Sequence, residues 1–147
     1  MNILSFLFIS FLQAEMPTQK ISFSSGAQLE VEVAQTDAHR MKGLMNRTGL
    51  KKNSGMLFIF AVPQTLSFWM KDTYIPLSIG YFDKNKTLKE IHKLKPQNMM
   101  ELKQDLKSYP SHCRCQYAIE VNQGWFKRNK VKVGDNFKAT KLEKMHQ

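Results

Sequence analysis

Residues Gly55 to Phe82 read GMLFIFAVPQTLSFWMKDTYIPLSIGYF, and the predicted fold is built around them. The apolar runs in this stretch have the length of strands rather than of a buried helix, and proline and turn residues separate them. We predict strands over residues 56–60, 66–70 and 77–82. The single cation inside this apolar stretch, Lys71, follows Trp69 closely, and lysine is seldom buried without a partner. Lys71 either extends to water with its stem over Trp69 or projects into a pocket beside the indole.

The segments on either side of this stretch predict further strands. Residues 20–24 and 29–33 alternate apolar and polar side chains around a Ser-Gly turn, which predicts a β-hairpin. Additional strands are predicted at 88–94, 117–121 and 136–142, with a short helix over 125–129 and a long loop over 97–112 that has one helical turn around 99–102. The expected fold class is α+β, mainly an antiparallel sheet that closes into a barrel-like single domain with two short helices.

The first of the two helices is predicted from Thr36, its N-cap candidate, to about residue 46. Such a helix would place Arg40 and Arg47, two turns apart, on roughly the same face. Its inward side chains are expected to be Met41, Leu44 and Met45.

The N-terminus carries an uncharged apolar run over residues 3–12, followed by the small residue Ala14. The run has the length of a signal-peptide core and is too short for a transmembrane helix. We interpret residues 1–14 as a signal peptide and 15–147 as a single domain, in preference to a buried N-terminal helix. The expected location is the periplasm or the extracellular space, with the membrane met only transiently during export.

The net charge of +10 at pH 7 favours anionic partners. The lysines are scattered rather than gathered in one run, and no RNA-binding, helix-turn-helix or zinc-finger pattern is present. A basic protein with a solvated basic surface is therefore favoured, and a nucleic-acid partner is not expected.

The two cysteines, Cys113 and Cys115, are separated by one residue, which makes a bridge between them strained. We favour a thiol pair or a reducible bridge without function. The alternative is a soft-metal site that uses the neighbouring His112, although a closed site needs a fourth ligand. No metal ligand and no cofactor is assigned.

Seven motifs stand in order along residues 20–140, namely VAQT (33–36), RMKGLMNR (40–47), GMLFIF (55–60), FWMKDT (68–73), IPLSI (75–79), AIEVNQG (118–124) and VGD (133–135). Their order resembles the family catalogued as domain of unknown function 192. The resemblance implies a compact, barrel-like single domain that is often exported from bacteria and archaea, and it implies no reaction. The family usually has an aspartate where this chain has Ser78. If that carboxylate pairs with the cation of the FWMKDT motif, Lys71 has lost a neighbour and the site is more cationic.

The first functional hypothesis is a non-catalytic module that binds a small anionic or saccharide ligand in a basic, aromatic-edged cleft. The predicted site residues are Arg40, Arg47, Trp69, Lys71, Thr73 and Glu120. The alternative is a structural or partner-binding protein of the cell envelope. For Glu120, both a buried carboxylate and an ion-pair partner of Arg40 or Arg47 are considered, and the ion pair is favoured.

The second alternative is a hydrolase-type enzyme. Catalysis needs a nucleophile or an acid/base pair joined by a hydrogen bond. The candidate groups are His39, Asp72, Thr73, Cys113 and Glu120, and no two have a spacing that the sequence alone brings together. No catalytic residue is therefore assigned, and a binding protein is preferred to an enzyme.

Overall fold

A seven-stranded sheet, in the order β6-β5-β8-β3-β2-β1-β9, forms the centre of the computed structural model, which describes residues 15–139. Its strands are β1 (Thr18–Phe23), β2 (Gln28–Ala34), β3 (Ser54–Gln64), β5 (Leu77–Phe82), β6 (Leu88–Leu94), β8 (Cys115–Asn122) and β9 (Phe137–Ala139). A separate pair is formed by β4 (Ser67–Trp69) and β7 (Ser108–Pro110). The helices are α1 (Asp37–Lys42), α2 (Trp125–Arg128) and the 3-10 helix η1 (Lys103–Asp105).

The sheet is mainly antiparallel, as predicted, but it contains one parallel pair and is open, so the prediction that it closes into a barrel is wrong. Strands β2 and β3 are parallel, because the chain between them crosses back through α1, and a parallel pair needs a long crossover of this kind. The sheet curls into a half-barrel. Near its two edges an isolated bridge joins Thr87 to Asn136, but within residues 15–139 no ladder continues from it.

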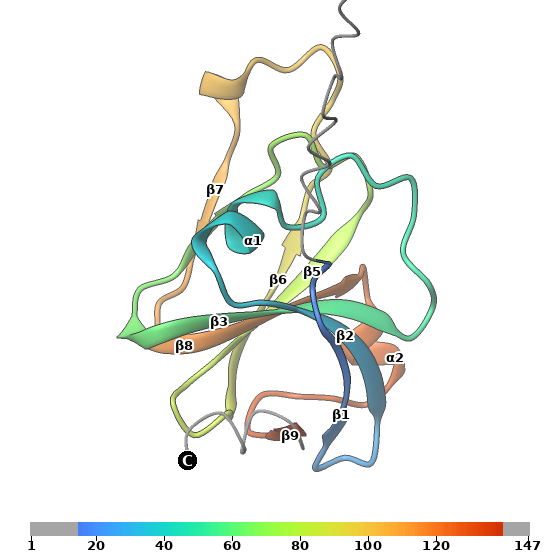
Figure 1. Cartoon of the computed structure of the whole chain (residues 1–147), viewed down its shortest axis with the longest axis vertical. Helices are drawn as coiled ribbons and strands as arrows, with labels where there is room; N and C mark the ends of the chain where they lie inside the picture. Colours follow the sequence, from blue (N-terminus) through green and yellow to red (C-terminus); the bar gives the residue numbers. More distant parts are fainter. Residues whose placement is uncertain (1–14, 140–147) are drawn as a thin grey trace, which may run out of the picture.

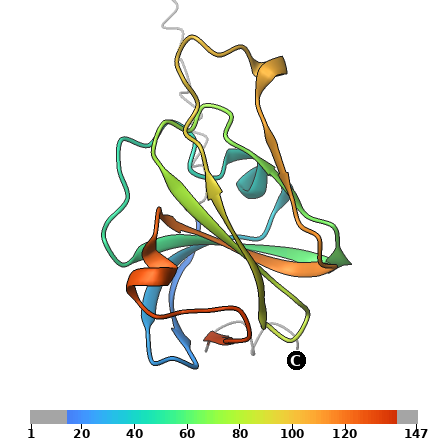
Figure 2. The same ribbon diagram turned by 180° about the vertical axis from the view of Figure 1, so that it is seen from behind.

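Figure 1 and Figure 2 show the curled sheet from opposite sides, and an apolar cluster covers each of its faces. One apolar cluster fills the inside of the curl, under β1, β9 and α2, and includes Leu57, Phe82 and Val121. The other lies between the sheet and the layer of α1, β4 and β7, and includes Met56 and Ile79. Because side chains alternate along each strand, neighbouring residues of β3, β5 and β8 enter different clusters. The layer of α1, β4 and β7 contains part of the predicted site.

The predicted hairpin is confirmed by the antiparallel pairing of β1 with β2, in which Ile21 lies opposite Leu29. The Thr36 N-cap is also confirmed, because its hydroxyl oxygen accepts a hydrogen bond from the His39 backbone N–H at 3.1 Å. Helix α1 ends at Lys42 rather than near residue 46, since Gly43 adopts a φ of 46° and ends the helix. As a result Met41 is exposed, contrary to the prediction, while Leu44 is buried.

Other boundaries differ from the prediction. Strand β3 continues past Pro63 to Gln64, and the helical turn in the long loop is η1 rather than residues 99–102. Strand β7, inside that loop, was not predicted. The predicted signal peptide and residues 140–142 of the predicted last strand lie outside the described residues. Within residues 15–139, no helix combines the length and the apolar character needed to span a membrane.

Candidate functional site

A pocket of about 40 Å³ lies between α1, the segment that follows β4, and the central strand β8. Five of the six predicted site residues line it: Arg40, Trp69, Lys71, Thr73 and Glu120. One water molecule occupies roughly 30 Å³ of liquid volume. The pocket can therefore hold about one water molecule or part of a small acidic group such as a carboxylate, whereas a sugar ring would have to lie at its rim.

Glu120 is the buried acid of this pocket. It lies on β8 between Met56 of β3 and Ile79 of β5, and its residue surface is 5% exposed. Among the described residues its carboxyl group makes no hydrogen bond and no ion pair, and its oxygens are not among the fully buried unpaired atoms, so they are open to the pocket. Burial raises the pKa of Glu120 from its ordinary value of 4.5 to about 8. At pH 7 the carboxyl group is therefore mostly protonated and can donate a hydrogen bond into the pocket.

Lys71 supplies the cation at the mouth of the pocket. Its ammonium lies 5.9 Å from the centroid of the Trp69 ring and 3.7 Å from a carboxylate oxygen of Asp72, and its side chain is one-third exposed. Lys71 therefore matches the second of its two predicted placements, because it lines the pocket beside the indole. The Thr73 hydroxyl donates to the Lys71 carbonyl at 2.9 Å and so fixes the backbone of this turn.

The turn is anchored on both sides by its neighbours. Asp72 has a left-handed φ of 50°, and its N–H donates to the Gln97 side-chain oxygen at 2.6 Å. The Asp72 carbonyl accepts a hydrogen bond from the Asn46 N–H at 2.7 Å. The segment after α1 and the long loop thus hold the lysine-bearing turn in place.

Arg40 lies in the pocket wall, but its guanidinium is already engaged. It donates to the carbonyls of Gln35 and Ile59, forms an ion pair with Asp37, and packs over the Phe60 ring with its centre 5.1 Å from the ring centroid. Its main contribution to the pocket is therefore its positive charge.

Arg47 lies outside the pocket, contrary to its predicted place in the site. Because α1 ends at Lys42, the chain turns before Arg47, which forms an ion pair with Glu32 of β2 at 2.7 Å. The preferred prediction that Glu120 pairs with Arg40 or Arg47 is wrong, since both arginines have other carboxylate partners.

Ser78, the residue that stands where the family was expected to have an aspartate, does not lie at this pocket. Ser78 and Glu120 lie on neighbouring strands, but Ser78 belongs to the opposite face of the sheet, where its hydroxyl oxygen accepts a hydrogen bond from the Gly124 N–H at 3.0 Å. The idea that Lys71 has lost a partner at position 78 is therefore wrong. Ser78 instead borders a separate groove of about 670 Å³ beside α2, with lysines such as Lys127 and Lys130 at its edge.

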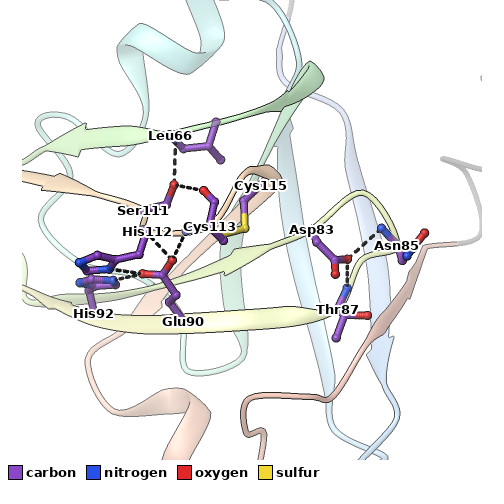
Figure 3. The surroundings of a disulfide bond; sticks show 10 residues. All are labelled: Leu66, Asp83, Asn85, Thr87, Glu90, His92, Ser111, His112, Cys113 and Cys115. Carbon is purple, nitrogen blue, oxygen red and sulfur yellow. Dashed lines mark hydrogen bonds and ion pairs between the residues drawn. A yellow bond between two sulfur atoms is a disulfide. The ribbon is translucent and has the colours of Figure 1, made fainter.

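A second polar cluster lies where β6 meets the loop that precedes β8 (Figure 3). One Glu90 carboxylate oxygen is 2.9 Å from His92 Nε2 and 3.0 Å from His112 Nδ1. Desolvation acts to raise the pKa of Glu90, but hydrogen bonds from both histidine rings and from two backbone N–H groups outweigh it and lower the pKa to about 2. The carboxylate is therefore ionised at neutral pH.

The cysteines beside this cluster form a disulfide, with their Cα atoms 5.4 Å apart (Figure 3). Of the predicted alternatives, the structure contains the bridge, so the thiolates are not free to bind a metal together with His112. Ser111 supports the loop, because its hydroxyl donates to the Cys113 carbonyl and accepts from the Leu66 N–H, both at 2.9 Å.

The family profile of domain of unknown function 192, described as an uncharacterized ACR, matches residues 20–139. The chain belongs to this DUF192 family. No curated protein sequence matches the chain.

Two solved structures resemble this DUF192 protein. A suggested transcription regulator from Sinorhizobium meliloti 1021 is 28% identical, with a TM-score of 0.77 over 87% of this chain and 98% of the other. A protein of unknown function from Novosphingobium aromaticivorans DSM 12444 is also 28% identical, with a TM-score of 0.70 over 84% of each chain. The DUF192 fold is therefore shared across most of the chain.

Sequence reasoning missed several residues of the two clusters in this DUF192 protein. The Lys103 ammonium of η1 lies 5.2 Å from the Trp69 ring centroid, on a loop whose sequence has no periodicity to locate it. Glu90 and His92 were also missed, although their spacing of two residues on a predicted strand places them on one face.

Proposed function

We propose that this DUF192 protein is a binding module for a small oxyanion, either free or as the acidic group of a larger molecule. The observation that carries the proposal is the Glu120 carboxyl group, buried without an internal hydrogen-bond partner at a pocket that Lys71 also lines. A buried polar group without a protein partner is costly, so the Glu120 oxygens need water or a bound molecule in the pocket as their hydrogen-bond partner.

The chemistry of the pocket favours an anion over a cation. A protonated Glu120 donates a hydrogen bond and carries no charge that would repel an anion. The Lys71 ammonium and the nearby Arg40 guanidinium add positive charge. One close charge pair contributes ~1 to 4 kcal/mol, depending on its exposure to solvent.

The rim of the pocket favours an acidic sugar among larger ligands. Trp69 is 44% exposed, and the ammonium groups of Lys103 and Lys71 lie over its ring at 5.2 Å and 5.9 Å from the centroid, so an indole and two cations meet at the exposed rim. An indole face of this kind suits a sugar ring. The carboxylate of a uronic acid could then enter the pocket while its ring lies over Trp69.

Calorimetric titration of the full chain with inorganic phosphate, acetate and glucuronate tests the proposal, with glucose as the uncharged control. We expect binding of at least one of the anions and weaker or no binding of glucose. Replacing Lys71 by Met should weaken anion binding about tenfold or more, equivalent to ~1.4 kcal/mol. The matched control is Arg47→Ala, which removes a cation outside the pocket and should leave anion affinity unchanged.

Two Glu120 variants test the role of the acid itself. Glu120→Gln keeps a hydrogen-bond donor and should retain most of the anion affinity, whereas Glu120→Leu should lose it. The proposal is overturned if no anion binds, or if Arg47→Ala and Lys71→Met reduce affinity equally. Binding of a DNA duplex without any response to small anions would instead favour the regulatory role suggested for the Sinorhizobium meliloti structure.

We also propose that the protein is exported. The apolar run of residues 3–12 supports this, as does the Cys113–Cys115 disulfide, because disulfides persist mainly in oxidising compartments. Mass spectrometry of the protein from periplasmic and extracellular fractions should find a chain that begins near residue 15. Recovery of an unprocessed chain from the cytoplasm alone would refute export.

A further inference from the structure

Three side chains outside the Glu120 pocket bring their ligand atoms together on the surface of β6. Glu90 and His92 come from this strand and His112 comes from the loop before β8 (Figure 3). The three potential ligand atoms all lie within 4.8 Å of one another. The proposed anion binding does not use this cluster.

The spacing of these atoms is close to that of a metal site. Tetrahedral zinc has bonds of ~2.0 to 2.1 Å to nitrogen and oxygen, which places neighbouring ligand atoms ~3.3 Å apart. Both histidine nitrogens lie at 2.9–3.0 Å from the same Glu90 oxygen, so small rotations of the side chains would open the required space. A carboxylate only accepts hydrogen bonds, so each ring now directs an N–H at this oxygen. A metal ion would take the place of those two protons.

The surroundings hold the cluster in this arrangement. The second Glu90 oxygen accepts hydrogen bonds from the backbone N–H groups of His112 at 2.7 Å and Cys113 at 2.6 Å. The edge-on contact of His92 with Tyr81, at 5.5 Å between ring centroids, limits rotation of His92, and the disulfide ties Cys113 to β8. Such outer contacts orient metal ligands in known sites.

The site would also be open to solvent. The His112 side chain is 86% exposed, while Glu90 and His92 are 15% and 25% exposed. A set of two imidazoles and one carboxylate with an accessible fourth position is typical of zinc sites that keep a bound water. Imidazole nitrogens favour zinc, copper and nickel over calcium and magnesium.

We propose that Glu90, His92 and His112 bind one divalent transition-metal ion, with zinc as the reference ion and water in the open position. The alternative is a purely structural role, in which Glu90 only holds the loop against β6 through hydrogen bonds. This proposal does not depend on the anion-binding proposal, because the two clusters share no residue.

Zinc titration of the full chain, purified without a histidine tag and in competition with a chromophoric chelator, tests the site. We expect one zinc ion per chain. His92→Gln and His112→Gln should each weaken zinc binding about tenfold or more, whereas the matched control His39→Gln on α1 should bind as the unchanged protein does. Of the two variants, His112→Gln should disturb the fold less, since the His112 side chain is largely exposed and Glu90 keeps its backbone hydrogen bonds.

A double variant, Cys113→Ser with Cys115→Ser, separates this site from a thiolate site. Zinc affinity should be unchanged in the double variant, and cobalt bound to the unreduced protein should show no thiolate charge-transfer band. The proposal is overturned if no zinc binds, if both histidine variants bind normally, or if binding requires reduced cysteines.

Discussion

The Glu120 carboxyl group and the Lys71 ammonium line the same small pocket, yet no ion pair joins them. Lys71 lies nearest the Asp72 carboxylate, at 3.7 Å, and Glu120 is buried more deeply on β8. Because burial raises the pKa of Glu120 to about 8, the acid is mostly neutral at pH 7 and needs no cation beside it. Neither group is therefore engaged by the other, and Lys71 would contact a bound anion while it is also paired with Asp72.

The raised pKa of Glu120 predicts that the folded state loses stability as pH rises. In the unfolded chain the carboxyl group releases its proton near pH 4.5, whereas in the folded protein it holds the proton until about pH 8. The stability contribution is thus fully present below pH 4.5 and is lost between pH 4.5 and about 8.

Glu120→Gln removes this proton equilibrium. The free energy of unfolding of the variant, relative to that of the unchanged protein, should therefore increase as pH rises from 4.5 to about 8. The relative gain should be on the order of a few kcal/mol. Urea denaturation of both proteins near pH 4.5 and above pH 8 measures it, and the other titrating groups cancel in the comparison. Parallel pH profiles for the two proteins would contradict the assignment.

Gly80 of β5 allows α2 to pack on the sheet. A Cβ atom at this position would lie 2.8 Å from the Phe126 ring and 3.0 Å from a Leu88 methyl group. Gly80→Ala should therefore lower the free energy of unfolding by ~1 to 3 kcal/mol. Gly49→Ala is the control, because a Cβ there meets nothing within 4 Å and the cost should stay within ~0.5 kcal/mol. Equal urea midpoints for the two variants would refute this packing argument.

The disulfide should contribute little to stability, because it closes a loop with a sequence separation of only two residues. Loop-closure entropy for so short a loop gives ~1.5 kcal/mol. The Cys113→Ser, Cys115→Ser variant should lose about that amount in urea denaturation, and the unchanged protein should lose a similar amount when reduced. A loss well above ~3 kcal/mol would mean that the bridge also holds the loop against β6.

Local patterns in the sequence predicted the local parts of the fold. Alternation located the β1–β2 hairpin, and the hydroxyl of Thr36 identified the start of α1. The end of α1 could also have been predicted, because glycine often ends helices and Gly43 does so here. The prediction extended the helix past Gly43 and therefore misplaced Arg47. Whether the sheet closes could not be predicted from the sequence, since closure depends on pairing between edge strands that are far apart in the chain.

The candidate site could likewise be predicted only in part, because its local motifs are visible in the sequence and its long-range contacts are not. Five of the six residues chosen from the motifs line one pocket, but no pattern in the sequence shows that Ser78 lies on the opposite face of the sheet from Glu120. That relationship depends on the register between β5 and β8, which joins segments far apart in the chain. The contact of His112 with Glu90 and His92 depends likewise on the path of the long loop.

Carbon-13 NMR titration of the Glu120 side-chain carboxyl, with and without inorganic phosphate, tests whether this acid is the anion-binding donor. We expect a carboxyl group that stays protonated up to about pH 8 and whose pKa rises further when phosphate binds, because the protonated form is the donor. A Glu120 carboxyl that ionises near its ordinary value of 4.5, or one that does not respond to any of the anions tested, would contradict this expectation.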